Sequence, residues 1–285
     1  MTISTKITAE TAFIDASQSV GKTTAAPRNR IPVAVYSALT VIALLGLWSL
    51  AAKFGAVSPV FLPAPWTVAA SLWSLVTVGF VDSTLLEHVS ASLGRVLAAL
   101  LVSLAIGVPA GLLIATTRAG KGILDPIVEF LRPLPPLAYL PLVIIWVGIG
   151  ETSKITVIAL SMLPSIILST SAGVAAVPRD YINAARSFGA SRWQVLLQVI
   201  LPATLPSILT GTRIALGTGW STLVAAELVA ATKGLGFMIQ SAAQFLVTDV
   251  VIAGIAIIAA IAVVLELAAR AIERKFVPWA RKSQG

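Results

Sequence analysis

The stretch VVIAGIAIIAAIAVVL at residues 250–265 decides the fold class, because it contains no charged or strongly polar side chain. Inside the hydrocarbon core of a membrane, every backbone N–H and C=O must find its partner within the protein. Only α-helices and closed β-barrels satisfy that condition, and a barrel strand would alternate apolar with polar residues. This stretch does not alternate, so it predicts a membrane-spanning helix that continues to about residue 270.

The composition of the whole chain supports the same conclusion. Of 285 residues, 57% are hydrophobic and only 11% are charged, whereas soluble domains carry about 25% charge. A net charge of +8 could suggest a nucleic-acid partner. In a membrane protein, however, Lys and Arg are enriched in the loops on the cytoplasmic side, so we expect no nucleic acid. The absence of Cys excludes disulfide frameworks, Cys-bound metals and thiol nucleophiles. An all-α integral membrane protein is therefore predicted.

Six regions are long enough and apolar enough to cross a membrane as helices. They are residues 33–52, 96–117, 133–150, 155–178, 203–232 and 250–270, some of them broken by Pro or by a single charge. Small residues predict close packing between these helices. They are Gly107, Ala110, Gly111, Gly217 and Gly219.

The distribution of basic residues predicts the orientation of the chain. With six spans, most of the 20 Lys and Arg residues fall on one side, within residues 6–30, 118–121, 179–192 and 270–282. Positive charge accumulates on the cytoplasmic side, so both termini should be cytoplasmic. We expect residues 1–30 to form a flexible polar tail without a signal peptide, and residues 271–285 to form a basic tail.

Residues 31–84 are predicted to contain the first span and an outer segment that lies on the membrane. This segment carries three prolines between residues 59 and 65, followed by an amphipathic run with Trp66 and Trp73. Tryptophan is enriched at membrane interfaces, so a helix lying in the interface is expected. A re-entrant segment is the alternative.

Catalytic motifs are missing from the sequence. Residues 21–23 spell the end of a phosphate-binding loop, but the glycine that the motif needs five residues earlier is replaced by Ala16. The single histidine, His88, stands beside Glu87 near a span boundary, where a solvated helix start is the simplest interpretation. Neither metalloprotease nor serine hydrolase motifs occur, so no catalytic residue and no metal site are predicted.

The loop at residues 178–202, PRDYINAARSFGASRWQVLLQVILP, predicts a short helix outside the membrane. Pro178 ends the preceding helix, Asp180 is a candidate cap, and Gly189 closes the stretch from Tyr181 to Phe188. The small residues Ala184 and Ala185 would let the groove of another protein approach the backbone closely. The alternative is an ordinary amphipathic connector.

This loop resembles the EAA loop of permease subunits in bacterial ABC importers. The spacing matches at Asn183, Ala184, Ala185, Gly189, Val199, Leu201 and Pro202. Two positions depart from the pattern: Asn183 replaces the usual Glu, and Val199 replaces the usual Ile. Further segments resemble the sulfonate, nitrate and taurine branch of this family, at residues 62–65, 125–155 and 219–259.

The resemblance implies a type I importer permease fold with a core at residues 85–270, in the bacterial inner membrane. It also implies a dimer of ATP-binding subunits that use ATP and Mg, a second permease subunit in a homodimer, and a periplasmic binding protein. No cofactor is expected in this chain. Asn183, Ala184, Ala185, Gly189, Leu201 and Pro202 would couple the chain to the ATPase. The implied substrate is taurine or a related small sulfonate, with alkanesulfonates or nitrate as alternatives.

Two charged residues are candidates for the translocation pathway. Glu227 lies deep in a predicted span, where an ionisable group either faces a polar cavity or holds two helices together. Arg132 precedes Pro133, Pro135 and Pro136, so a cation stands where the helix loses its regular hydrogen bonds. Arg132 suits a sulfonate, or else it extends to the cytoplasmic surface.

A self-contained secondary transporter is the competing class of function. Such a protein would predict an internal repeat and several carboxylates within the membrane. The sequence has no clear repeat, and Glu227 is its one convincing buried carboxylate. An importer subunit is therefore favoured.

Overall fold

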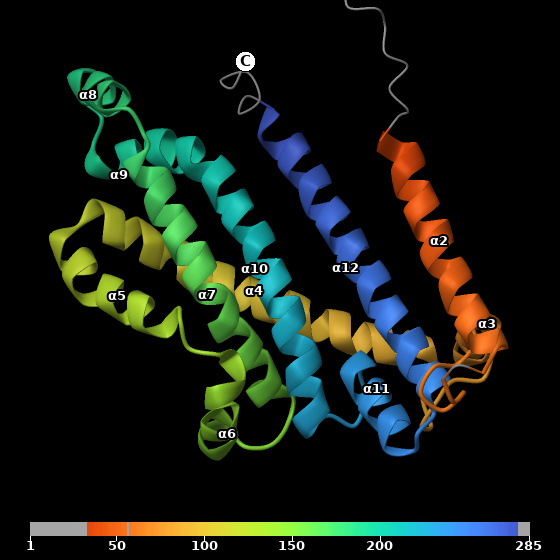
Figure 1. The fold of residues 1–285 in the computed structure, drawn as a ribbon. Helices are drawn as coiled ribbons and strands as arrows, with labels where there is room; N and C mark the ends of the chain where they lie inside the picture. Colours follow the sequence, from red (N-terminus) through yellow and green to blue (C-terminus); the bar gives the residue numbers. More distant parts are fainter. Residues whose placement is uncertain (1–32, 56, 279–285) are drawn as a thin grey trace, which may run out of the picture. The chain divides into compact units, whose positions relative to one another are not determined.

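The computed structural model describes residues 33–55 and 57–278, and every long element among them is helical. The elements are α2 Val33–Lys53, α3 Pro65–Thr77, α4 Leu85–Thr116, α5 Arg118–Leu131, α6 Pro136–Val147, α7 Glu151–Ala175, α8 Arg179–Ser187, α9 Arg192–Gln194, the π-helical segment η1 Val195–Ile200, α10 Leu201–Ala230, α11 Leu235–Gln244 and α12 Thr248–Phe276 (Figure 1). The predicted tail at residues 1–30 and the end of the basic tail lie outside the described residues.

The predicted all-α membrane fold is confirmed. Five helices are long and apolar enough to cross a membrane, and α5 with α6 forms a sixth candidate span that is bent by 109°. The span predicted at residues 133–150 contains α6, which is a candidate span only together with α5, as a bent pair. Helix α6 has 12 residues and is about 18 Å long, less than the thickness of the hydrocarbon core. Three prolines between residues 133 and 136 lack an N–H donor, which breaks the helix at this point.

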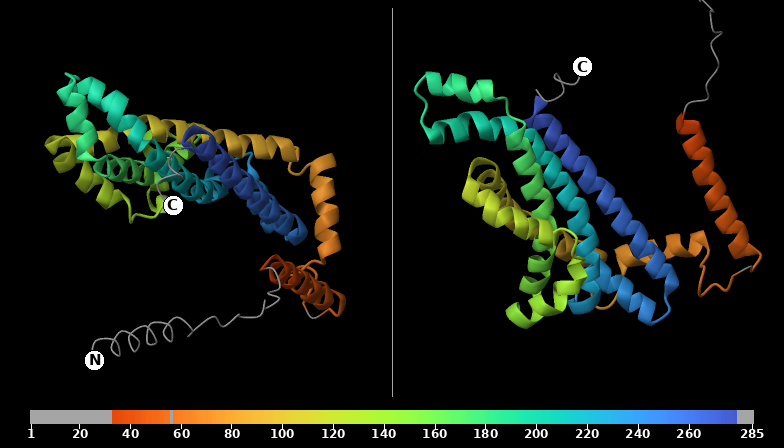
Figure 2. Two further views of the ribbon diagram at one scale, coloured as in Figure 1. Left: turned by 90° about the horizontal axis from the view of Figure 1, so that it is seen from above. Right: turned by 60° about the vertical axis from the view of Figure 1, so that its left-hand side comes forward.

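The chain divides into two units, residues 1–50 and 51–285. In the first unit, α2 exposes its apolar side chains, as a helix in lipid does. In the second unit, α7 crosses α4 and runs alongside α10 (Figures 1 and 2). The largest buried side chains lie mainly on these three helices and on α11, including Ile158, Met162, Ile166 and Leu223.

Glycines allow α4, α7 and α10 to approach one another closely, as predicted for Gly107, Gly111 and Gly219. A β-carbon at Gly111 would lie 2.6 Å from Thr170 Cβ and 2.7 Å from the carbonyl oxygen of Ile167. At Gly107 it would lie 2.9 Å from the side chain of Ile166. Gly217 differs, because it has open space around it.

We expect Gly111→Ala to lower the free energy of unfolding by about 1–3 kcal/mol, because the added methyl group overpacks the contact between α4 and α7. The matched control is Gly122→Ala on α5, where a β-carbon meets nothing within 4 Å. Both variants gain the same helix propensity, so the difference between their thermal unfolding midpoints in detergent measures the clash. Equal midpoints would contradict the prediction.

Helix α3 is amphipathic, as the sequence predicted. Val68, Ser71 and Leu75 are buried along one side, whereas Trp66 and Trp73 are exposed. The buried side packs on the start of α12, where the Ser71 hydroxyl donates a hydrogen bond to a carboxylate oxygen of Asp249. The position of α3 at the membrane surface stays a prediction.

The two ends of the second unit differ in charge. Helices α8 and α9 and the C-terminal end of α12 lie at one end, and α6 and α11 lie at the other (Figure 1). The first end carries a group of exposed basic side chains: Arg179, Arg186, Arg192, Arg274 and Lys275. This is the end that the charge distribution predicts to be cytoplasmic.

Candidate coupling and translocation sites

The predicted coupling segment forms a nine-residue helix, α8, at one end of the second unit (Figures 1 and 2). Its N-cap is Pro178, which makes no side-chain capping bond. The predicted cap by Asp180 was therefore wrong, because this residue lies inside the first turn. The negative charge of Asp180 still faces the positive end of the helix dipole, where it is favourable.

Gly189 ends α8 in a Schellman motif. Its φ of +80° lies in the left-handed region, where glycine avoids the strain that a β-carbon would cause. The Gly189 N–H donates to the carbonyl of Arg186 at 2.9 Å, and the Ala190 N–H donates to the carbonyl of Ala185 at 3.1 Å. These two bonds turn the chain sharply from α8 into α9.

Three large aromatic side chains on α8, on α9 and on the turn between them are exposed beside the arginines of these helices. Phe188 is 92% exposed, Trp193 71% and Tyr181 61%. Asn183 and Ala184 are exposed, whereas Ala185 is half-buried. Large aromatic side chains held outside the protein core are typical of a binding surface.

The segment that follows, η1, is a π-helix that leads into α10 at Leu201 and Pro202. Pro202 has no N–H, so the carbonyl of Gln198 loses its regular helical donor. The backbone widens here, and the Leu201 N–H donates to the carbonyl of Leu196. The end of the predicted EAA pattern therefore coincides with this irregular turn.

Arg132 lies at a cavity beside the break between α5 and α6. The cavity has a volume of about 520 Å³ and is lined by Leu131, Arg132, Leu134, Pro136, Tyr139, Leu160, Ser161, Pro164, Ser165, Gly217, Thr218, Ser221 and Thr222. The lining residues of α7 and α10 come from the middle of each helix. The cavity therefore lies at the mid-height of these two spans.

Arg132 is exposed at the end of α5, and its surroundings differ from those of Arg95 and Arg213. Arg95 pairs with Glu151 and Glu227, and Arg213 pairs with Glu266 and Glu273. Within the part of the chain that the structure describes, Arg132 makes no ion pair. It is also the one charged residue among those lining the cavity.

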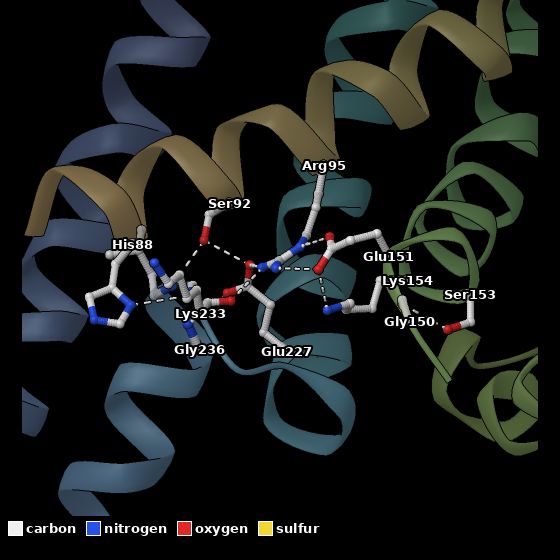
Figure 3. A network of polar contacts seen from close by, with 12 residues as sticks. His88, Ser92, Arg95, Gly150, Glu151, Ser153, Lys154, Glu227, Lys233 and Gly236 are labelled. Atoms are coloured by element: carbon white, nitrogen blue, oxygen red, sulfur yellow. Dashed lines mark hydrogen bonds and ion pairs between the residues drawn. The ribbon is translucent and has the colours of Figure 1, made fainter. Parts of the chain in front are cut away.

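Glu227 lies elsewhere, in a buried polar network (Figure 3). Its side chain is fully buried and accepts hydrogen bonds from the Ser92 hydroxyl at 2.8 Å and from the Gly236 N–H at 2.8 Å. Arg95 reaches from α4 between the carboxylates of Glu227 and Glu151. The network therefore joins α4, α7, α10 and the start of α11.

The network continues to Lys154 and Lys233. Lys154 is buried and donates to Glu151 at 2.7 Å, and Lys233 donates to Glu87 at 3.2 Å. The carbonyl of Lys233 also accepts from Arg95 at 2.8 Å. The buried charges of Arg95, Lys154 and Glu227 are thus compensated within the network, with Glu151 as a partly exposed partner, whereas the Lys233–Glu87 pair is exposed.

His88 belongs to the same assembly, and the expectation of a solvated histidine was wrong. The ring is fully buried, and its Nδ1 accepts a hydrogen bond from the Gly234 N–H at 3.1 Å. Its Nε2 lies 3.1 Å from the carbonyl oxygen of Phe80, to which it can donate. This arrangement requires the neutral ring with the proton on Nε2. His88 therefore ties the loop before α4 to the loop before α11.

The predicted site residues fall into three separate places. The coupling residues lie on α8 and on the turn into α10, Arg132 lies at the cavity, and Glu227 lies in the buried network. Glu227 is absent from the cavity lining. Its predicted role in translocation stays a prediction, and the contacts of its carboxylate agree with the alternative of a structural bond between helices.

Comparison with known proteins places the chain among transport components. Residues 107–278 match the family described as "Binding-protein-dependent transport system inner membrane component". The chain is 54% identical over 241 residues to the taurine transport system permease protein TauC of Escherichia coli (strain K12), covering 84% of this chain and 88% of TauC. It is 36% identical over 238 residues to the putative aliphatic sulfonates transport permease protein SsuC of the same strain, covering 84% and 89%.

The fold is also similar to a solved structure. A chain of the MetNI methionine ABC transporter in an inward facing conformation matches with a TM-score of 0.58 and 22% identity, covering 75% of this chain and 98% of that chain. At this identity the similarity concerns the fold. It confirms the predicted architecture of an ABC importer permease.

Proposed function

The chain belongs to the family of binding-protein-dependent transport system inner membrane components, and we propose that it is the permease subunit of an ABC importer for taurine. The observation that carries this proposal is the identity of 54% to TauC over most of both chains. The identity of 36% to SsuC keeps alkanesulfonates as the second candidate substrate. The chain itself is a transport component and not an enzyme.

Its partners follow from the kind of transport system. A binding-protein-dependent ABC importer needs an ATPase and a substrate-binding protein in addition to the permease. We propose that two copies of this chain form the pathway and that two ATPase subunits hold the ATP and Mg. Both termini and α8 would then face the cytoplasm, and the end with α6 and α11 would face the periplasm.

Helix α8 would transmit motion from the ATPase. Its exposed aromatic side chains and the small residue Ala184 suit a helix held in a groove of a partner. Asn183 offers a neutral amide where a carboxylate is usual, so we expect docking to depend on shape more than on an ion pair. Movement of α8 would pass through η1 into α10, which is a continuous helix of 30 residues.

The test is uptake of radiolabelled taurine into cells that lack their own taurine uptake. We expect uptake only when the chain is expressed together with its ATPase and its binding protein, and only background uptake when either partner is omitted. Excess unlabelled alkanesulfonate or nitrate, each added separately, shows whether the system prefers another substrate. Uptake by the chain alone, driven by an ion gradient, would instead establish a secondary transporter.

A further inference from the structure

We propose that the cavity at the break between α5 and α6 is a binding subsite for a small zwitterionic sulfonate, with Arg132 facing the sulfonate group. This inference rests on the proposed function and adds where and how the permease itself recognises its substrate. Four observations support it: the position of the cavity, its volume, its single charged residue and the hydrogen bonds that its hydroxyl groups already donate.

The position suits a translocation site. The cavity lies against the middle of α7 and α10 and beside an interrupted helix pair, where backbone without regular hydrogen bonds is tolerated because it lines a polar space. Transporters bind their substrates at such discontinuous helices near the middle of the membrane. The volume of about 520 Å³ falls within the range of small-molecule sites.

The single cation determines which charge the cavity accepts. Arg132 is an exposed residue at the cavity, and it differs from Arg95 and Arg213, each of which pairs with two carboxylates. Arg132 is not neutralised in this way by any residue that the structure describes. No carboxylate lines the cavity, so an anionic group is attracted and a simple cation is repelled. A planar guanidinium binds two oxygens of a sulfonate at once.

The hydroxyl groups that line the cavity offer hydrogen-bond acceptors to the ammonium group of the ligand. Four of the lining hydroxyls already donate their proton to a carbonyl of their own helix: Ser161 to Ile158 at 2.7 Å, Thr218 to Ala215 at 2.9 Å, Ser221 to Gly217 at 3.2 Å and Thr222 to Thr218 at 2.9 Å. Their oxygens keep lone pairs that accept hydrogen bonds. An ammonium group has donors only, so this wall of the cavity suits the amine of a zwitterion.

The arrangement predicts an order of preference. A sulfonate that carries an ammonium group can bind both Arg132 and the hydroxyl oxygens, whereas ethanesulfonate can bind only Arg132. Ethanolamine has the ammonium without the anion and therefore leaves Arg132 unpaired. We expect taurine to bind more tightly than ethanesulfonate, and ethanolamine to bind least.

The decisive experiment uses the complete importer in lipid vesicles, with the ATPase and the binding protein, and compares the wild type with Arg132→Gln and Arg132→Lys. We expect Arg132→Gln to lower taurine uptake at least about tenfold, the loss of a charge-assisted bidentate contact. The stimulation of ATP hydrolysis by loaded binding protein should persist, so hydrolysis proceeds without transport. Arg132→Lys should recover part of the uptake. The matched control is Arg118→Gln, which removes an exposed arginine at the start of α5, outside the cavity.

A second variant tests the hydroxyl wall without changing charge. Ser221→Ala should weaken equilibrium binding of taurine to the permease–ATPase complex without binding protein about two- to tenfold, and leave ethanesulfonate unchanged. An equal effect on both ligands would overturn the orientation that we propose.

The outcomes separate the two levels of the proposal. If the wild-type importer moves no sulfonate, the proposed function fails and the subsite fails with it. If the wild type transports taurine and Arg132→Gln transports it equally well, the subsite alone is overturned. Loss of uptake together with loss of stimulated ATP hydrolysis, in a variant that still assembles, would place Arg132 in the conformational cycle and would also overturn the subsite.

Discussion

Replacement of Glu227 by Ala is expected to lower the free energy of unfolding by about 3–5 kcal/mol, the cost of breaking a buried ion pair from one side. The side chains of Glu227 and Arg95 are 0% and 5% exposed, so water cannot replace the lost carboxylate. Ser92 and the Gly236 N–H lose their acceptor in the same change. Thermal unfolding in detergent, followed by the amount of monodisperse protein, measures the effect.

The matched control is Glu273→Ala, which removes a carboxylate from a partly exposed ion pair. Its partner Arg213 is 31% exposed and keeps Glu266 as a second partner. We expect a loss below about 1 kcal/mol, as for a solvated pair. If both variants shifted the unfolding midpoint equally, the network would not carry the stability assigned to it.

Glu227→Gln separates the structural role from a role in transport. The amide oxygen can still accept from Ser92 or from Gly236, but the negative charge is gone. If uptake for each folded importer equals that of the wild type, the charge of Glu227 serves the fold. Lost uptake in fully folded importer would instead return Glu227 to the translocation pathway.

Gly189→Asp is expected to abolish uptake and the coupling of ATP hydrolysis to transport, while leaving membrane insertion intact. An aspartate at φ +80° strains the Schellman turn and shifts α9 relative to α8. It also adds a charge to a surface that must lose water when a partner binds, which is costly without a counter-charge. Uptake and stimulated ATP hydrolysis are measured on importer quantified by its membrane content.

Gly55→Asp is the control for the backbone strain. Gly55 also has a positive φ, of +64°, and open space around its α-carbon, but it follows α2 rather than α8. We expect this variant to be inserted and to transport normally. If Gly189→Asp transported normally as well, α8 would be an ordinary connector and the coupling assignment would fail.

The parts of the fold that the sequence predicted are those with local causes. An apolar run long enough to cross a membrane satisfies its own backbone, so residues 250–265 predict their helix without reference to any partner. The same holds for Gly189, because the left-handed turn after α8 is formed within a few residues. The bounds of the third span were less accurate, because the prolines at residues 133–136 were placed at the start of this span, whereas in the structure they separate α5 from α6 within one bent pair.

The buried network was missed because its partners are far apart in the chain. Arg95 contacts Glu151 and Glu227 only after α4, α7 and α10 have packed together. No short sequence motif predicts contacts between residues so far apart in the chain. One signal was available: His88, Ser92 and Arg95 stand at positions i, i+4 and i+7 of one helix, a spacing that places them on the same face. Polar side chains that line up on an otherwise apolar helix indicate a buried partner, and that pattern would have placed His88 inside the protein.

The π-helical segment η1 has a consequence for the geometry of the coupling surface. An α-helix advances by about 100° per residue, and a π-turn accommodates one residue more than an α-turn. The single surplus residue in η1 therefore sets the angular phase between α9 and the whole length of α10. Two chains that differ by one residue in this segment would share every helix and yet present different side chains on the surface that we propose for the ATPase. Alignments of this family should accordingly treat a one-residue gap at residues 195–200 as a rotation of the coupling surface rather than as a shortened loop.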